Sequence, residues 1–210
     1  MRAIVLGSGS ARRRELLKVA GLFFTIARPD IDETPGPSEP PAHYVLRLSR
    51  EKAAALPAQS IPPNAVIITA DTTVVEGGEI IGKPANPDEA RAMLRRLRGH
   101  PHHVLTGVSV RDTATGHTAS TLTETSVNVR DYTDAEIEAY IASGDPFDKA
   151  GAYAVQHPEF RPVASLDGCL TNVIGLPLCT LCAMLREVGI EAPHPPPCSP
   201  QRLPCTAPMP

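Results

Sequence analysis

The chain has 210 residues and a formal net charge of −3; 42% of its residues are hydrophobic, 20% are charged and 4% are aromatic, with no Trp. This length suffices for one sizeable hydrophobic core, or for a core divided into two lobes, built mainly from Ala, Val, Ile and Leu. The small net charge argues against a broad basic surface for nucleic acid, so a polyanionic ligand has to be bound by a local cluster of Lys and Arg.

The first third of the chain alternates strand and helix signals around a Gly/Ser turn and a Pro-rich loop. The turn comprises residues 7–10, Gly21 is a stop signal for the helix after it, and the loop runs to about Pro41 and contains Glu33. The predicted elements are a strand over residues 3–6, a helix over 11–20, a strand over 22–27 and a helix over 43–55.

The rest of the chain begins with a buried-strand run over residues 66–70, which we expect to end on Asp71. Asn86 followed by Pro87 predicts a helix start, and residues 133–136 form a capping box at the start of another helix. The predicted elements are hairpins over residues 73–81 and 103–130, helices from 87 to 98 and from 134 to 143, a strand over 162–166 and a helix over 177–188.

These elements predict an α/β protein with a mixed sheet, since two hairpins interrupt the alternation of strands and helices. We expect one domain over residues 1–191 and a disordered tail over residues 192–210, which contains many prolines and no apolar periodicity. The first apolar run is too short for a signal peptide, and no run is long enough to span a bilayer, so we expect a cytoplasmic protein with no membrane partner.

The turn over residues 7–10 is a candidate phosphate-binding site. It lies between a strand and a helix, where free backbone N–H groups and the helix dipole attract anions, and Arg12 and Arg13 follow it. The turn lacks the Lys-Ser/Thr pair of a Walker A loop and the third Gly of a dinucleotide-binding fingerprint. Without other information, an ordinary turn followed by a solvated basic helix face is at least as good an interpretation.

Two acidic residues are candidate metal ligands and catalytic groups. Asp71 follows a buried strand, where functional groups are common in α/β sheets, and Glu33 lies in the long loop. Two carboxylates from separate segments can share a hard cation such as Mg²⁺ or Mn²⁺. The alternative is that Asp71 caps a turn and Glu33 is solvated.

Three lysines, Lys52, Lys83 and Lys149, are uninformative when each is considered alone, because lysines near turns are usually solvated. Together with Arg12 and Arg13, they can supply the local positive cluster that the composition requires.

These segments together resemble the Maf family over residues 4–189. The family's opening motif, Leu-Ala-Ser-x-Ser-Pro-Arg-Arg-x-Glu-Leu-Leu, is similar to residues 6–17 of this chain. The motifs that follow, in the family's order, are Ile31-Asp32-Glu33-Thr34, Lys52-Ala53, Ala70-Asp71-Thr72-Thr73, Gly82-Lys83-Pro84, Thr106-Gly107-Val108, Asp148-Lys149-Ala150-Gly151-Ala152-Tyr153 with Gln156, and Asn172-Val173-Ile174-Gly175-Leu176-Pro177.

The resemblance implies a fold like that of the inosine-triphosphatase superfamily, an elongated α/β body with a cleft between two lobes. It also implies hydrolysis of a nucleoside triphosphate to the monophosphate and pyrophosphate, a divalent metal (Mg²⁺ or Mn²⁺), and a homodimer. The segment from Asp148 to Gln156 resembles the branch that acts on dTTP and UTP. Two alternatives remain: a non-catalytic nucleotide-binding regulator of cell division, and a pyrophosphatase of the sister branch that acts on 7-methyl-GTP.

Within this interpretation, Asp71, Glu33 and Lys83 are the expected catalytic residues, with Glu33 and Asp71 as metal ligands. Thr72 and Gln156 are expected to help read the base. The other expected substrate ligands are Ser8, Ser10, Arg12, Arg13, Lys52 and Lys149.

The chain departs from the family at two single positions and in one segment. Gly7 and Ala11 stand where the family has Ala and Pro, and we expect Gly7 to loosen the loop. After Gln156, many members have a Gly-rich sequence where this chain has residues 157–160, His-Pro-Glu-Phe.

Overall fold

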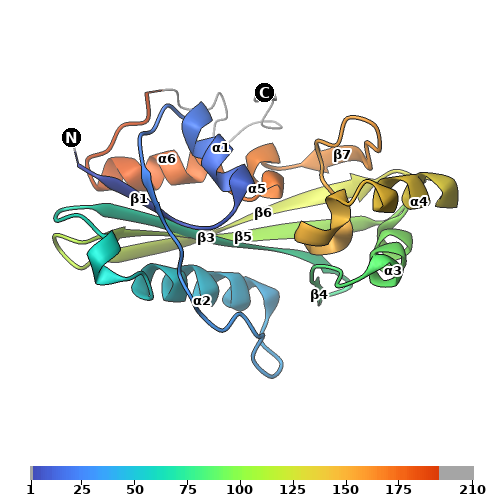
Figure 1. Ribbon diagram of the computed structural model, residues 1–210, viewed down its shortest axis with the longest axis horizontal. Coiled ribbons are helices and arrows are strands. Elements are labelled where there is room, and N and C mark those ends of the chain that lie inside the picture. The colour runs from blue at the N-terminus through green and yellow to red at the C-terminus, as the bar shows by residue number, and fades with distance from the viewer. Residues whose placement is uncertain (1, 194–210) are drawn as a thin grey trace.

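The computed structural model describes residues 2–193, which form one mixed sheet with helices on both of its faces (Figure 1). The predicted Pro-rich tail lies outside the described residues, apart from Ala192 and Pro193. Ala192 is 8% exposed and belongs to a hydrophobic core cluster. The packed part of the chain therefore extends past the predicted boundary at residue 191.

Most of the predicted elements are present, and their starts follow the local signals. Asn86 caps one helix by accepting a hydrogen bond from the Glu89 backbone, and Thr133 and Glu136 form the predicted capping box. The strands are β1 (Ile4–Gly7), β2 (Thr25–Ala27), β3 (Val66–Glu76), β4 (Glu79–Ile81), β5 (Pro101–Asp112), β6 (Thr118–Val129) and β7 (Val163–Asp167). The helices are α1 (Ala11–Val19), α2 (Pro41–Ala54), α3 (Pro87–Leu97), α4 (Asp134–Ala142), α5 (Leu170–Ile174) and α6 (Leu178–Glu187), with short 3-10 turns η1 (Ala58–Ser60), η2 (Asp145–Asp148) and η3 (Ala150–Ala152).

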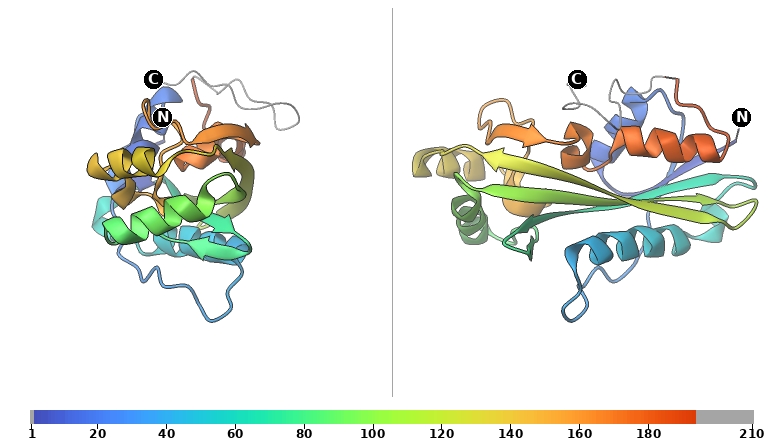
Figure 2. Two further views of the ribbon diagram at one scale, coloured as in Figure 1. Left: turned by 90° about the vertical axis from the view of Figure 1, so that its right-hand side faces the viewer. Right: turned by 180° about the vertical axis from the view of Figure 1, so that it is seen from behind.

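The sheet has the strand order β2-β1-β3-β5-β6-β7, and β4 pairs with β3. Strand β1 runs parallel to β2 and β3, and all other pairs are antiparallel. The predicted α/β class with a mixed sheet is thus confirmed. The long strands β3, β5 and β6 cross the length of the molecule, with α6 on one face and α2 on the other (Figure 2).

Two main hydrophobic cores lie at opposite ends of the long strands, which gives the body its two lobes. Strand β3 contributes to both, because Val66 and Ile68 belong to the first core and Val74 to the second. Helices α1 and α6 complete the first core, and helices α3 and α4 complete the second. The polar residues of β3 between these apolar segments therefore lie between the lobes.

One predicted boundary is wrong, because β3 does not end on Asp71. Asp71 lies in the middle of an unbroken strand, opposite Gly107 of β5. Asp disfavours strands, so a local interpretation stops there, but the ladder with β5 and an ion pair to Asp71 compensate for that preference. The strand predicted over residues 22–27 is present only as the three residues of β2, and the five-residue helix α5 was not predicted.

Helix α2 packs unusually closely on the sheet at Gly107. A Cβ added to Gly107 would lie 2.4 Å from the Val45 carbonyl oxygen and 2.8 Å from the Leu46 nitrogen, both in the α2 backbone. A backbone cannot move aside as a flexible side chain can, so only Gly permits this approach. This contact fixes the position of α2, and therefore of Lys52 near its end.

No helix within residues 2–193 has the length and apolar character needed to cross a membrane.

We expect Gly107→Ala to lower the free energy of unfolding by about 1–3 kcal/mol, because the new methyl group would force α2 away from β5. Urea unfolding followed by circular dichroism measures the change. Gly82→Ala is the matched control, since a Cβ there would contact no atom within 4 Å. Equal stability of the two variants would contradict the close-packing argument.

Candidate functional site

A cleft of about 730 Å³ lies between the two lobes, a volume suited to a nucleotide-sized ligand. Its walls come from the turn between β1 and α1, the end of β2, the middle of β3, the segment after β4, the segment around η3 and the end of α5. All of the residues predicted as site residues line this cleft: Ser8, Ser10, Arg12, Arg13, Glu33, Lys52, Asp71, Thr72, Lys83, Lys149 and Gln156.

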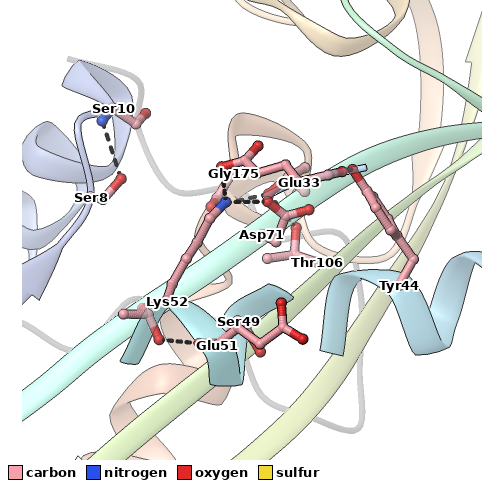
Figure 3. Close-up of polar contacts among 12 residues, drawn as sticks. Ser8, Ser10, Glu33, Tyr44, Ser49, Glu51, Lys52, Asp71, Thr106 and Gly175 are labelled. Carbon is pink, nitrogen blue, oxygen red and sulfur yellow. Dashed lines mark hydrogen bonds and ion pairs between the residues drawn. The ribbon is translucent and has the colours of Figure 1, made fainter. Parts of the chain in front are cut away.

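The centre of the site is a buried ammonium group between two carboxylates (Figure 3). Lys52 Nζ lies 2.6 Å from Asp71 Oδ1 and 2.8 Å from Glu33 Oε1. The side chains of Lys52 and Asp71 are 9% and 10% exposed, whereas that of Glu33 is 53% exposed. Asp71 therefore does not cap a turn: it is a buried, ion-paired carboxylate of a strand. The structure brings Asp71 and Glu33 to one ammonium group, and a divalent cation shared by the two carboxylates stays a prediction.

The loop that carries Glu33 is held by α2. Tyr44 donates a hydrogen bond of 2.9 Å from its hydroxyl to the Glu33 carbonyl oxygen, and Arg47 donates to the Thr34 carbonyl and to both carboxylate oxygens of Glu39. Burial, aided by the charges of Asp71 and Glu33, raises the pKa of Tyr44 to about 12, so its hydroxyl remains a donor at neutral pH. These contacts place the Glu33 carboxylate over Lys52.

The turn after β1 is organised by its own hydroxyls. Ser10 is the N-cap of α1, which starts at Ala11 without the family's Pro, and Ser8 Oγ accepts from the Ser10 backbone. We expected Gly7 to loosen this loop, but Gly7 belongs to strand β1 and pairs with Ala27 of β2. A Cβ at Gly7 would lie 2.6 Å from Thr69 Cγ2, so Gly7 is a packing requirement of buried strand β1.

Arg13 points across the cleft and is anchored at several points. Its guanidinium donates to the Gly175 carbonyl at 2.8 Å, to Thr72 Oγ1 at 3.0 Å and to Ser8 Oγ at 3.4 Å. Burial lowers the pKa of Arg13 from its usual value, although nearby Asp71 opposes the shift. Thr72 thus positions Arg13, and the role of Thr72 in reading the base stays a prediction.

Arg12 spans the mouth of the cleft and joins the two lobes. Its guanidinium pairs with Asp148 at 2.9 Å, and Lys149 donates to Asp148 and to two oxygens of Asp145. Burial alone raises the pKa of Asp148, but the hydrogen bond from Lys149 and the charge of Arg12 outweigh it and lower that pKa. Lys149 is therefore already surrounded by acceptors, and direct contact with a substrate remains a prediction for it.

Three exposed side chains on the cleft walls make no hydrogen bond or ion pair with another residue in the described part of the chain: Arg28, Lys83 and Gln156. Lys83 and Gln156 were predicted from the sequence, but Arg28 was not. The only local signal for Arg28 was its place directly after the strand over residues 22–27.

The end of the cleft near Gln156 is mainly apolar and lies in the second lobe. It is lined by Val74, Ile80, Val104, Ala150, Tyr153, Val155 and Val173. After Gln156, the chain departs from the Gly-rich family pattern, and Phe160 is buried there and stacks on Tyr140 with ring centroids 4.3 Å apart. This segment is therefore anchored in the second core. A cleft with a charged end and an apolar end suits a ligand that joins phosphates to a base.

Comparisons with known proteins agree with this geometry. The model of the family described as "Maf-like protein" matches residues 3–188. The chain belongs to the Maf family. A protein from Anaeromyxobacter dehalogenans (strain 2CP-C), named dTTP/UTP pyrophosphatase, is 46% identical over 192 residues, which cover 90% of this chain and 96% of the relative.

Two further Maf relatives carry the same name. The protein from Hahella chejuensis is 46% identical over 191 residues, which cover 90% of this chain and 94% of the relative. The protein from Pelotomaculum thermopropionicum is 45% identical over 189 residues, which cover 90% of this chain and 98% of the relative.

A buried histidine supports the apolar end of the cleft. His102 is 1% exposed, and its Nε2 lies 2.7 Å from the hydroxyl of Tyr153, while its Nδ1 has no hydrogen-bond partner in the described residues. Protonation would place an N–H with no acceptor at Nδ1. Burial, with a smaller contribution from the charge of His103 that outweighs that of Glu76, lowers the pKa of His102 to about 4.

We expect His102 to make the fold sensitive to acid. The unfolded histidine takes up a proton near pH 6.5 and the folded one only near pH 4. Neutral His102 therefore makes its full contribution to the free energy of unfolding above pH 6.5, and this contribution falls as the pH drops toward 4. Between pH 7 and 4.5, the wild type should lose about 2 to 3 kcal/mol more than His102→Gln, measured by urea unfolding at each pH. His117→Gln, at an exposed position away from His102, should follow the wild type. Parallel curves for the wild type and His102→Gln would refute this role.

Proposed function

We propose that this protein hydrolyses a nucleoside triphosphate between the α- and β-phosphates, releasing the monophosphate and pyrophosphate, with dTTP and UTP as favoured substrates. The observation that carries the proposal is the Lys52 ammonium group held between Asp71 and Glu33 in a cleft with cationic walls. Membership of the Maf family and relatives named dTTP/UTP pyrophosphatase support it.

The two carboxylates fit a hard divalent cation, Mg²⁺ or Mn²⁺. Glu33 and Asp71 both contact the Lys52 ammonium group, and within residues 2–193 no group of three His, Cys, Asp or Glu side chains converges on one point. Mg²⁺ in phosphate-processing sites is often held by one or two carboxylates, with substrate phosphates and water as the remaining ligands. When bound, the cation would polarise the α-phosphate and neutralise its charge.

The chain's own residues supply positioning and proton acceptance. Asp71 orients the attacking water and accepts its proton, and Lys52 holds the Asp71 carboxylate in place through the 2.6 Å contact. Arg12 and Arg13 bind phosphate oxygens from the start of α1, and Lys83 neutralises charge on the leaving group from the opposite wall. Phosphoryl transfer depends mostly on such positioning and charge neutralisation.

Removal of Asp71's basicity tests the mechanism. Asp71→Asn keeps the side-chain size but cannot accept the proton, so we expect kcat for UTP to fall roughly a hundredfold to ten-thousandfold. Pyrophosphate release by purified protein, with Mg²⁺ and with chelator, measures the effect across canonical and modified nucleotides.

Asp167→Asn, on exposed strand β7, is the control and should retain full activity. Near-full activity of Asp71→Asn would overturn the assigned role. Nucleotide binding without release of pyrophosphate from any substrate would favour the alternative of a non-catalytic regulator, and a purine preference would favour the 7-methyl-GTP branch.

Gln156 is proposed to read the base at the apolar end of the cleft. A Gln amide offers one donor and one acceptor side, which complement the N3–H and O4 edge shared by uracil and thymine, whereas cytosine reverses that edge. We expect kcat/KM for UTP to exceed that for CTP by at least about tenfold, because a mismatch between the amide and the base leaves polar groups without hydrogen-bond partners. Gln156→Ala should reduce this ratio, and similar turnover of CTP and UTP by the wild type would contradict the role.

The metal requirement, nucleotide-pool housekeeping and a homodimer stay predictions of the family resemblance, and a cytoplasmic location stays a prediction from the lengths of the apolar runs. The first of these is tested by the chelator arm of the assay.

A further inference from the structure

Most cations of the cleft are already paired within the protein. Lys52 is shared by Asp71 and Glu33, Arg12 pairs with Asp148, and Lys149 is surrounded by oxygens of Asp145 and Asp148. A triphosphate carries about four negative charges and needs positive groups that protein carboxylates do not already neutralise. The cleft-lining cations with no carboxylate partner in the described residues are Arg13, Arg28 and Lys83.

The sheet register places Arg28 beside the phosphate-binding turn. Strands β1 and β2 are parallel, and Gly7 pairs with Ala27, so the next residues, Ser8 and Arg28, leave the sheet side by side. A Cβ built on Gly9 would lie 3.7 Å from Arg28 Nε, which shows that the guanidinium lies against the turn backbone. The lack of a side chain at Gly9 leaves this face of the turn open toward Arg28.

The position of Arg28 relative to Asp71 indicates which phosphates it can reach. In the strand order, β2 lies two strands away from β3, so the backbone of Arg28 lies roughly 10 Å to the side of Asp71. The apolar base end of the cleft lies further along β3, toward Val74 and Tyr153 in the second lobe. With the base at the apolar end and the α-phosphate at Asp71, the outer phosphates lie within reach of the side of the cleft that carries Arg28.

We propose that Arg28 is a phosphate-binding residue for the β- and γ-phosphates, which leave together as pyrophosphate. The inference rests on the proposed pyrophosphatase function and adds a substrate ligand to it. Arg28 then contributes to recognition of the triphosphate and of the pyrophosphate product, and not to recognition of the nucleoside monophosphate.

Separate binding of the two products tests this assignment. We expect Arg28→Ala to weaken binding of inorganic pyrophosphate roughly tenfold to a hundredfold, the usual loss for a charge-assisted hydrogen bond, and to raise KM for UTP to a similar degree. Binding of UMP should change less than about twofold, and Arg28→Lys should recover part of the lost affinity. Isothermal titration calorimetry with pyrophosphate and with UMP, in the presence of Mg²⁺, measures both constants without turnover.

Arg14→Ala is the matched control, because Arg14 carries the same charge on α1 but does not line the cleft. It should bind pyrophosphate as the wild type does. Equal pyrophosphate affinities of the Arg28→Ala and Arg14→Ala variants would overturn the proposal. The proposal would also be overturned if Arg28→Ala weakened the binding of UMP as much as that of pyrophosphate, or if the wild type did not bind pyrophosphate. If the protein hydrolyses no nucleotide but still binds pyrophosphate through Arg28, the proposed function is refuted, whereas the assignment of Arg28 as an anion-binding residue is supported.

Discussion

The site depends on the close contact between α2 and the sheet at Gly107. With no side chain on Gly107, the α2 backbone at Val45 rests directly on strand β5, opposite the position of Asp71 on β3. Seven residues further along the helix, two turns, Lys52 lies on the same face and reaches Asp71 at 2.6 Å. A larger residue at position 107 would lift α2 and lengthen this contact, because helix and strand backbones are both rigid.

The buried ammonium group links this packing to chemistry. Burial of one charge is costly, and the cost is offset only when a partner stands at close range with good geometry. Lys52 meets this condition with Asp71 from the strand and Glu33 from the loop, which Tyr44 ties to α2. Both carboxylates are thereby fixed on one ammonium group before any ligand arrives, which is the preorganisation that the proposed mechanism requires.

The long strands β3, β5 and β6 explain how one sheet serves two lobes. Each end of β3 is apolar and enters a separate core, while Asp71, Thr72 and Thr73 between them face or border the cleft. The Arg12–Asp148 ion pair connects the lobes across the mouth of this cleft. Arg12, Arg13 and Arg28 therefore line the cleft from the side of the first lobe, and apolar side chains such as Val74 and Tyr153 line it from the second.

The sequence alone determined which helices and strands form wherever a local signal marks them, and it determined the family to which the chain belongs. The caps at Asn86 and Thr133, the helix spacing in α2 and the ordered Maf motifs act within a few residues of the chain, and the structure bears them out. The charged residues that line the cleft also lie within these motifs, apart from Arg28.

Only the tertiary structure decided how these residues are used. Asp71 lies in mid-strand because β5 and Lys52 compensate for its poor strand preference, and Thr72 holds Arg13 because chain segments 59 residues apart meet. Gly7 is required by the methyl group of Thr69, and Arg28 joins the cleft through the parallel register of β1 with β2. Contacts between residues distant in the chain leave no local pattern, so no reading of composition, capping or periodicity could have revealed them.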